Sequence, residues 1–119
     1  MTYGTIAQKV NHMVHNSIAT LASLADPVRM GIVAQLAGGD ATVGALAAPY
    51  DMSLQAVRKH LALLESAGLV ASRKTGRVRL CSLQKAPIRE AVSWLNSRAR
   101  LWEDRLDALA DVVEERRPR

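Results

Sequence analysis

The sequence contains few cysteines and few aromatic residues, and it has no long apolar run. Among 119 residues it has no phenylalanine, two tryptophans, two tyrosines and one cysteine. One cysteine excludes an internal disulfide framework, so the fold needs no oxidising compartment. Scarce aromatics argue against stacking platforms for single-stranded bases. No run approaches the roughly 18 to 20 apolar residues that cross a bilayer, and the N-terminus lacks a signal-peptide core, so we expect a cytoplasmic location.

What the sequence does contain is aliphatic and basic. Its hydrophobic content of 49% is enough for the core of one compact domain, which we expect to cover residues 1–119. Sixteen Lys and Arg against eleven Asp and Glu give a formal charge of +5. This balance favours a polyanionic partner, either nucleic acid or an anionic membrane surface, and charge alone does not choose between them.

Apolar spacing and capping residues predict three helices in the first part of the chain. Steps of three and four over residues 6–24 predict an amphipathic first helix. An aspartate followed by proline at 26–27 marks the start of a second helix, which glycines at 38–39 end. Thr42 caps a short third helix, and Pro49 ends it because the residue before a proline disfavours helical geometry.

A fourth helix and a hairpin follow. Ser53 is the N-cap of this helix and Gly68 ends it. From there the apolar period changes to two, which predicts strands over 69–74 and 77–83 around a tight turn at 75–76. The fold class is therefore mainly α with a small two-stranded β-hairpin. The buried stripe of the fourth helix is predicted to contain Leu54, Val57, Leu61 and Leu64.

The C-terminal part reads as one long helix over 87–115. Its apolar residues repeat in heptads: Ile88, Val92, Leu95, Ala99, Trp102, Leu106, Leu109 and Val113. No intrachain partner remains for this seam, so we expect a second copy to bury it in a twofold dimer. Packing of the seam on the first helix within a monomer is the alternative. The chain then divides into a dimerisation helix at 1–24, a core at 26–83 and a dimerisation helix at 87–115.

The positive charge is concentrated. Residues 53–79 contain six cations and one acid, Glu65, so this segment alone carries the whole excess of the chain. A charge run is usually only a solvated face. Here, however, the excess falls on one helix start and the adjacent hairpin, which is the pattern of a surface that contacts a groove and its phosphates. The hairpin contributes Arg73, Lys74, Arg77 and Arg79.

The start of the fourth helix carries side chains suited to base edges. Gln55 can present its amide to adenine, and Arg58 its guanidinium to guanine. Lys59 suits a base edge or a phosphate. Ser53 can cap the helix or bind a phosphate, and capping is the safer assignment. His60 is expected at the boundary of the surface or facing a phosphate rather than as a pH switch. Ala56, within the same first turns, completes the predicted DNA-binding residues.

Several segments together resemble the winged helix-turn-helix core of ArsR/SmtB-type bacterial regulators. The resemblance covers roughly residues 20–83, in order and in register. The residues that carry it are Leu24-Ala-Asp-Pro-Val-Arg29, Ala41-Thr-Val-Gly-Ala-Leu-Ala47, Met52-Ser-Leu-Gln-Ala-Val57, Lys59-His-Leu61 and Leu63-Leu-Glu-Ser-Ala-Gly-Leu-Val70.

The resemblance implies a homodimeric repressor that binds an inverted repeat near its own promoter. It assigns the fourth helix, 53–67, to the major groove, the basic wing, 70–83, to phosphates and the minor groove, and the first and fifth helices to the dimer interface. Two departures matter. Arg58 stands where many relatives have a small residue, so base preference cannot be carried over from them. Ala62 stands where a basic residue is frequent, which removes a phosphate contact.

Metal and redox sensing are not indicated. Many ArsR-type proteins bind metal through a Cys-x-Cys site at the third helix or Asp and His pairs on the last helix, and neither set is present, so the chain resembles the subgroup that lacks these sites. His12 and His15, at i and i+3, lack a third ligand and are expected to be surface or interface residues. Cys81 is expected to be a small buried hydrophobic residue rather than a redox sensor. We expect no metal and no cofactor.

Three function classes can be compared. A sequence-specific DNA-binding regulator explains the charge, the helix and the wing together. The alternative is a winged-helix interaction module whose basic face docks an acidic protein. An enzyme fits worst, because the sequence has no glycine-rich phosphate loop, nucleophile elbow or metal motif. The expected partners are double-stranded DNA, a second copy of the chain and a small-molecule effector whose identity the sequence does not specify.

Overall fold

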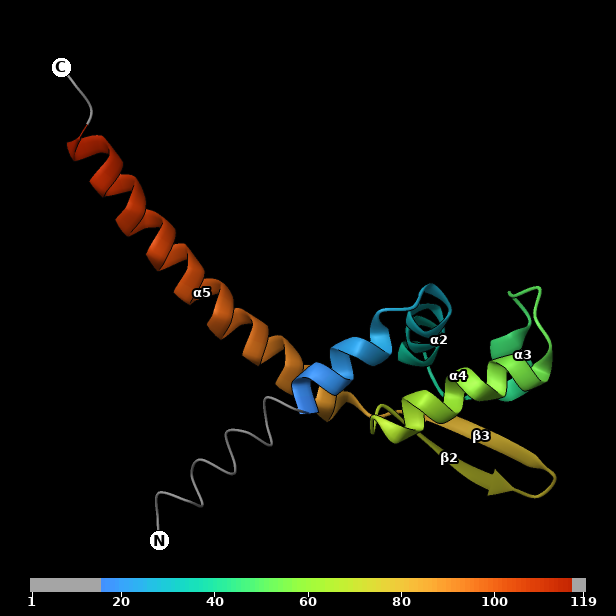
Figure 1. Ribbon diagram of the computed structural model, residues 1–119. Coiled ribbons are helices and arrows are strands. Elements are labelled where there is room, and N and C mark those ends of the chain that lie inside the picture. The colour runs from blue at the N-terminus through green and yellow to red at the C-terminus, as the bar shows by residue number, and fades with distance from the viewer. Residues whose placement is uncertain (1–15, 117–119) are drawn as a thin grey trace, which may run out of the picture.

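The computed structural model describes residues 16–116 (Figure 1). It confirms a mainly α fold with a β-hairpin. A first helix occupies Asn16–Leu24 within the described residues, and the rest of the segment predicted for it lies outside them, as do His12 and His15. The elements that follow are α2 (Pro27–Ala37), β1 (Ala41–Thr42), α3 (Val43–Ala47), α4 (Leu54–Ser66), β2 (Val70–Thr75), β3 (Val78–Leu83) and α5 (Lys85–Glu115).

The three predicted N-caps are confirmed by their hydrogen bonds. Asp26 Oδ1 accepts from the amides of Val28 at 2.9 Å and Arg29 at 3.1 Å at the start of α2. Thr42 Oγ1 and Ser53 Oγ each accept from the amide three residues on, both at 3.1 Å, at the starts of α3 and α4. An N-cap of this kind stabilises a helix by about 1 kcal/mol.

The sheet has one strand more than the predicted two-stranded wing. β2 and β3 pair from Val70↔Leu83 to Thr75↔Val78, so the turn is Gly76-Arg77, one residue later than predicted. Gly76 has a φ of 64°, the left-handed conformation that glycine adopts without strain. The short β1 adds to the other edge of β3 in the order β1-β3-β2. Two residues are too few to produce an alternating pattern, which is why periodicity missed β1.

The core lies where α2, α3 and α4 meet the base of the hairpin. Fully buried side chains include Ile32 of α2, Leu46 of α3, Val57 and Leu64 of α4, and Leu69 beside β2. The predicted stripe of α4 holds for Val57, Leu61 and Leu64. It is wrong for Leu54, which is 49% exposed, because the first residue of the helix lies beyond the edge of the core.

α5 begins two residues earlier than predicted and leaves the body of the molecule (Figure 1). Pro87 lies in the first turn, where its missing N–H removes no helical hydrogen bond. Ala91 is buried, whereas every residue from Leu95 to Arg116 is exposed. In the described chain no single helix is both long and apolar enough to span a membrane. Asn16–Leu24 and Pro27–Ala37 meet those criteria only jointly, across a bend of 100°.

Candidate nucleic-acid interface

The packing of α4 decides which of its residues face outward. Because Val57, Leu61 and Leu64 are buried, the opposite side of the helix is turned to solvent. Gln55, Arg58, Lys59 and Ala62 are exposed on it, and Ala56 is half-buried. The structure thus brings the predicted base-reading side chains onto the accessible side of one helix.

Ser53 serves as the cap of α4, and it is exposed. Its oxygen accepts the Ala56 amide, which leaves the hydroxyl hydrogen available to a further acceptor. Capping and phosphate binding are therefore compatible at this residue, since the first uses the oxygen as acceptor and the second uses the O–H as donor.

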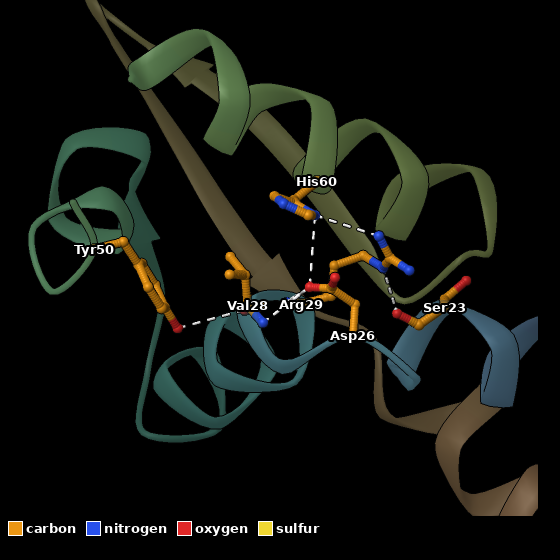
Figure 2. Close-up of polar contacts among 6 residues, drawn as sticks. All are labelled: Ser23, Asp26, Val28, Arg29, Tyr50 and His60. Atoms are coloured by element: carbon orange, nitrogen blue, oxygen red, sulfur yellow. Dashed lines mark hydrogen bonds and ion pairs between the residues drawn. The ribbon is translucent and has the colours of Figure 1, made fainter. Parts of the chain in front are cut away.

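His60 faces inward, toward the start of α2 (Figure 2). Its Nδ1 lies 3.9 Å from Asp26 Oδ1 and 3.3 Å from Arg29 Nη1, and the side chain is 19% exposed. This is a boundary position, one of the two places expected for it from the sequence. The ring connects α4, which carries the predicted base-reading residues, to the cap of α2.

Arg29 and Asp26 complete this cluster, and Arg29 has no role in the sequence-based site. Arg29 Nε donates to the Ser23 carbonyl at 2.7 Å, so the guanidinium joins the end of the first helix to α4 (Figure 2). The amide of Arg29 is the main reason that the pKa of Asp26 lies below its ordinary value. The Val28 amide and the charges of Arg29 and His60 also lower it, and desolvation opposes them. No local pattern signals contacts between residues more than thirty positions apart.

The wing gathers four exposed cations, Arg73, Lys74, Arg77 and Arg79. Lys74 lies directly opposite Arg79 in the β2–β3 ladder, so both point to the same face of the hairpin. Like charges placed opposite each other destabilise a sheet unless an anion lies between or beside them. Arg73 Nη2 lies 4.0 Å from Asp40 Oδ2, but both side chains are well exposed, so this pair contributes little.

A chain of two hydrogen bonds fastens the wing to α4. Ser72 Oγ donates to Glu65 Oε1 at 2.9 Å, and Arg79 Nη1 donates to the same Ser72 oxygen at 3.1 Å. Glu65 is the one acid in the basic segment, and these bonds give it a structural role. They hold Arg79 at the junction between the helix and the wing, and they were not foreseen from the sequence.

The surroundings of Cys81 and the placement of metal-ligating side chains bear on redox and metal sensing. Cys81 is 1% exposed in β3, and burial, aided by the charge of Glu65, raises the pKa of its thiol while Arg79 opposes the rise. The thiol is thus buried in the hydrophobic core, the position predicted for it. Within residues 16–116 no three His, Cys, Asp or Glu side chains gather as a metal site requires.

Comparison with known proteins agrees with this geometry. Residues 24–73 match the family model described as a helix-turn-helix domain. The HTH-type transcriptional regulator Rv2034 of Mycobacterium tuberculosis is 34% identical over 92 residues, covering 77% of this chain and 83% of that protein. The transcriptional repressor SdpR of Bacillus subtilis is 27% identical over 73 residues, covering 61% of this chain and 81% of that protein.

A solved structure extends the comparison to three dimensions. The ArsR family transcriptional regulator RHA00566 is 38% identical, covers 75% of this chain and 92% of its own, and superposes with a TM-score of 0.70. A helix-turn-helix in which the second helix, α4, exposes a polar side next to a basic wing defines a DNA-binding transcriptional regulator. The chain belongs to the ArsR family of these regulators. The proteins to which it is similar are named as regulators of transcription, not as enzymes.

Proposed function

We propose that the chain is a homodimeric repressor that binds an inverted-repeat operator, with α4 in the major groove and the wing on phosphates and the minor groove. The observation that carries the proposal is the location of the charge. The six cations of residues 53–79 lie on the outer side of α4 and on the wing, and all six are exposed. A helix fits the B-DNA major groove, and cations flanking it meet phosphates.

The exposed residues divide by the part of DNA that suits them. Gln55 and Arg58 read base edges through bidentate hydrogen bonds, and Lys59 takes a base edge or a phosphate. Ser53 and Ala56 lie beside them at the start of the helix. His60 contributes by fixing α4 against α2, with a phosphate as its outer contact. Phosphate binding is assigned to the wing residues Arg73, Lys74, Arg77 and Arg79.

The dimer is proposed to form through the helices of segments 1–24 and 87–115, outside the reading core 26–83. Support comes from the seam of α5. Val92, Leu95, Trp102, Leu106, Leu109 and Val113 are between 43% and 60% exposed in the single chain. An apolar stripe of this length on a charged helix is best buried by a second copy, and a twofold dimer presents two reading helices to successive turns of DNA.

The charges of α5 favour an antiparallel pairing of the two copies. Residues 85–100 carry four cations and one acid, whereas residues 101–115 carry six acids and one cation. Antiparallel helices place the basic half of one copy beside the acidic half of the other, and parallel helices would place like charges together.

Repression by occlusion is the simplest mode for such a dimer, because a protein bound across an operator covers DNA that the transcription machinery needs. The similarity to SdpR, which is named a transcriptional repressor, supports this direction. DNA as the partner agrees with the cytoplasmic location expected from the sequence. A small-molecule effector is proposed as the releasing signal.

Selection from a random pool of duplex DNA at about 150 mM salt tests the proposal, because nonspecific phosphate binding is weak there and base readout persists. A motif with twofold symmetry and half-sites about one helical turn apart is the expected result. If no motif emerges and the protein instead binds an acidic protein with the same salt sensitivity, the basic face is a protein-docking surface and the proposal fails.

A further inference from the structure

A hollow of about 350 Å³ lies between α2 and the start of α5, and none of the residues that line it belongs to the candidate DNA interface. Its apolar wall includes Met30, Ala34, Ala37 and Ile88, and Met30 is 49% exposed. Concave apolar surface of this size is typical of small-molecule sites. At about 30 Å³ for each water-sized group, the hollow holds roughly a dozen non-hydrogen atoms.

Two basic residues line the same hollow with the aliphatic parts of their side chains, since almost none of its exposed surface is polar. Lys85 and Arg89 lie one turn apart on α5. In the described part of the chain, no carboxylate lies within ion-pair distance of either one, since the ion pairs found there join His60 to Asp26 and Arg73 to Asp40. Residues 1–15 and 117–119 contain no Asp or Glu. The hollow therefore has an apolar wall built partly from the stems of Lys85 and Arg89, and no acidic side chain of the described chain balances the charged ends of these two residues.

We propose that this hollow binds a small apolar carboxylic acid, and that the bound acid changes the affinity of the protein for DNA. The hydrocarbon part lies against Met30, Ala34 and Ile88, and the carboxylate extends out of the hollow to the charged ends of Lys85 and Arg89. The second half of the inference rests on the proposed function. The first half concerns the hollow alone.

Charge complementarity selects this occupant over the protein's own N-terminal segment. Residues 1–15 contain Lys9, His12 and His15 without any acid, so they would add positive charge beside Lys85 and Arg89. A carboxylate neutralises both cations, while an apolar body covers the exposed methionine. An α5 helix of a second copy is the other candidate, and the experiment below separates it.

The position of the hollow explains how a bound ligand could affect α4, the helix proposed to contact bases. One wall belongs to α2, and the cap of α2 contacts α4 through Asp26, Arg29 and His60 (Figure 2). The other wall belongs to α5, which carries the proposed dimer seam. A ligand that alters the packing of α2 on α5 therefore alters the position of α4 relative to the dimer axis.

The binding test uses octanoate, which has an apolar body and a carboxylate of suitable size, in calorimetric titrations of the full chain. Uncharged 1-octanol and the short acid acetate are the comparison ligands. Octanoate is expected to bind at least fivefold more tightly than 1-octanol, and acetate is expected not to bind. The double variant Lys85→Gln with Arg89→Gln should weaken octanoate about tenfold and leave 1-octanol unchanged.

Two further variants control the result. Ala34→Trp fills the hollow from an exposed position and should abolish binding of both ligands. Arg100→Gln removes a cation farther along α5 and should leave octanoate binding unchanged. Failure of octanoate to bind the unaltered protein, or equal binding by the double variant, overturns the proposed site. Failure to bind together with a change in dimerisation on Ala34→Trp assigns the hollow to a second copy.

The regulatory half is tested on a selected duplex. Saturating octanoate is expected to change the affinity for that duplex at least threefold, and the duplex should change octanoate affinity by the same factor. An unchanged DNA affinity with octanoate bound overturns the regulatory half. If selection yields no DNA motif, the proposed function fails, while the calorimetric comparison still decides whether the hollow binds an apolar acid.

Discussion

At the scale of single residues, the cluster of Asp26, Arg29 and His60 links the N-terminal part of the fold to the reading helix. Asp26 caps α2 through two amides, and the same oxygen lies 3.9 Å from His60 of α4. Arg29 reaches both the Ser23 carbonyl and His60. A carboxylate that is both a cap and a neighbour of two basic groups is more stable when ionised.

Asp26→Asn is expected to make stability less dependent on acid. Since the folded pKa of Asp26 lies below its unfolded value, the charge contributes stability that is present above the unfolded pKa, about 3.9, and lost as pH falls through the folded pKa. Asparagine keeps the capping oxygen without the charge. In urea unfolding from pH 7 to pH 2, the gap between wild type and variant should narrow below about pH 4. A gap that is constant over this range contradicts the assignment.

The residue scale also shows the limit of sequence reasoning. The capping role of Asp26 was predictable because it depends on the next three residues. Its contact with His60 was not, because it depends on how α2 and α4 pack. The same holds for the bonds from Ser72 to Glu65 and from Arg79 to Ser72, which require the hairpin to fold against α4.

At the scale of elements, caps and glycines specify where helices and strands begin and end. α2, α3 and α4 start at the predicted caps, and Gly68, with a φ of 76°, follows α4 as predicted. The two-residue β1 was not predicted because it is too short to show an alternating apolar pattern. Only its pairing with β3 identifies it as a strand. The outward side of α4 was predictable, because the apolar spacing fixes which side is buried.

Substitutions at Ser53 separate its contribution to the stability of α4 from its contribution to DNA binding. Ser53→Ala removes the cap of α4 and should lower the free energy of unfolding by about 1 kcal/mol, measured by thermal or urea unfolding. Ser53→Asn restores the cap and should restore stability. If DNA affinity recovers with Ser53→Asn, the hydroxyl acts through the helix alone. If stability recovers and affinity does not, the hydroxyl also binds a phosphate, and unchanged stability in Ser53→Ala contradicts the cap.

At the scale of the whole molecule, the described residues of one chain leave α5 uncovered from Leu95 to Glu115. Its apolar heptad seam is a feature of the sequence and was the basis for predicting a dimer, and the structure shows the seam exposed on a helix that leaves the body (Figure 1). Heptad spacing can reveal such a seam, but the direction in which the helix leaves depends on the packing of Ala91 and its neighbours.

Leu106→Asp is expected to convert the dimer to monomer. It places a charge in the middle of the seam, where burial without a partner is costly, so dimerisation should weaken by at least about a hundredfold, or about 3 kcal/mol. Ser97→Asp, also on α5 but outside the seam, is the control. Light scattering with size-exclusion chromatography measures both. Equal oligomeric states for wild type and Leu106→Asp would refute the interface.

A comparison of two variants decides whether α4 contacts bases while the wing contacts phosphates. Wild type, Arg58→Ala and Arg77→Ala are titrated against the selected duplex and an unrelated duplex over a range of salt. Arg58→Ala is predicted to cost about 1 to 3 kcal/mol on the selected duplex only, whereas Arg77→Ala should weaken both duplexes alike and reduce the salt slope by about one. Unchanged binding by both variants would contradict the claim.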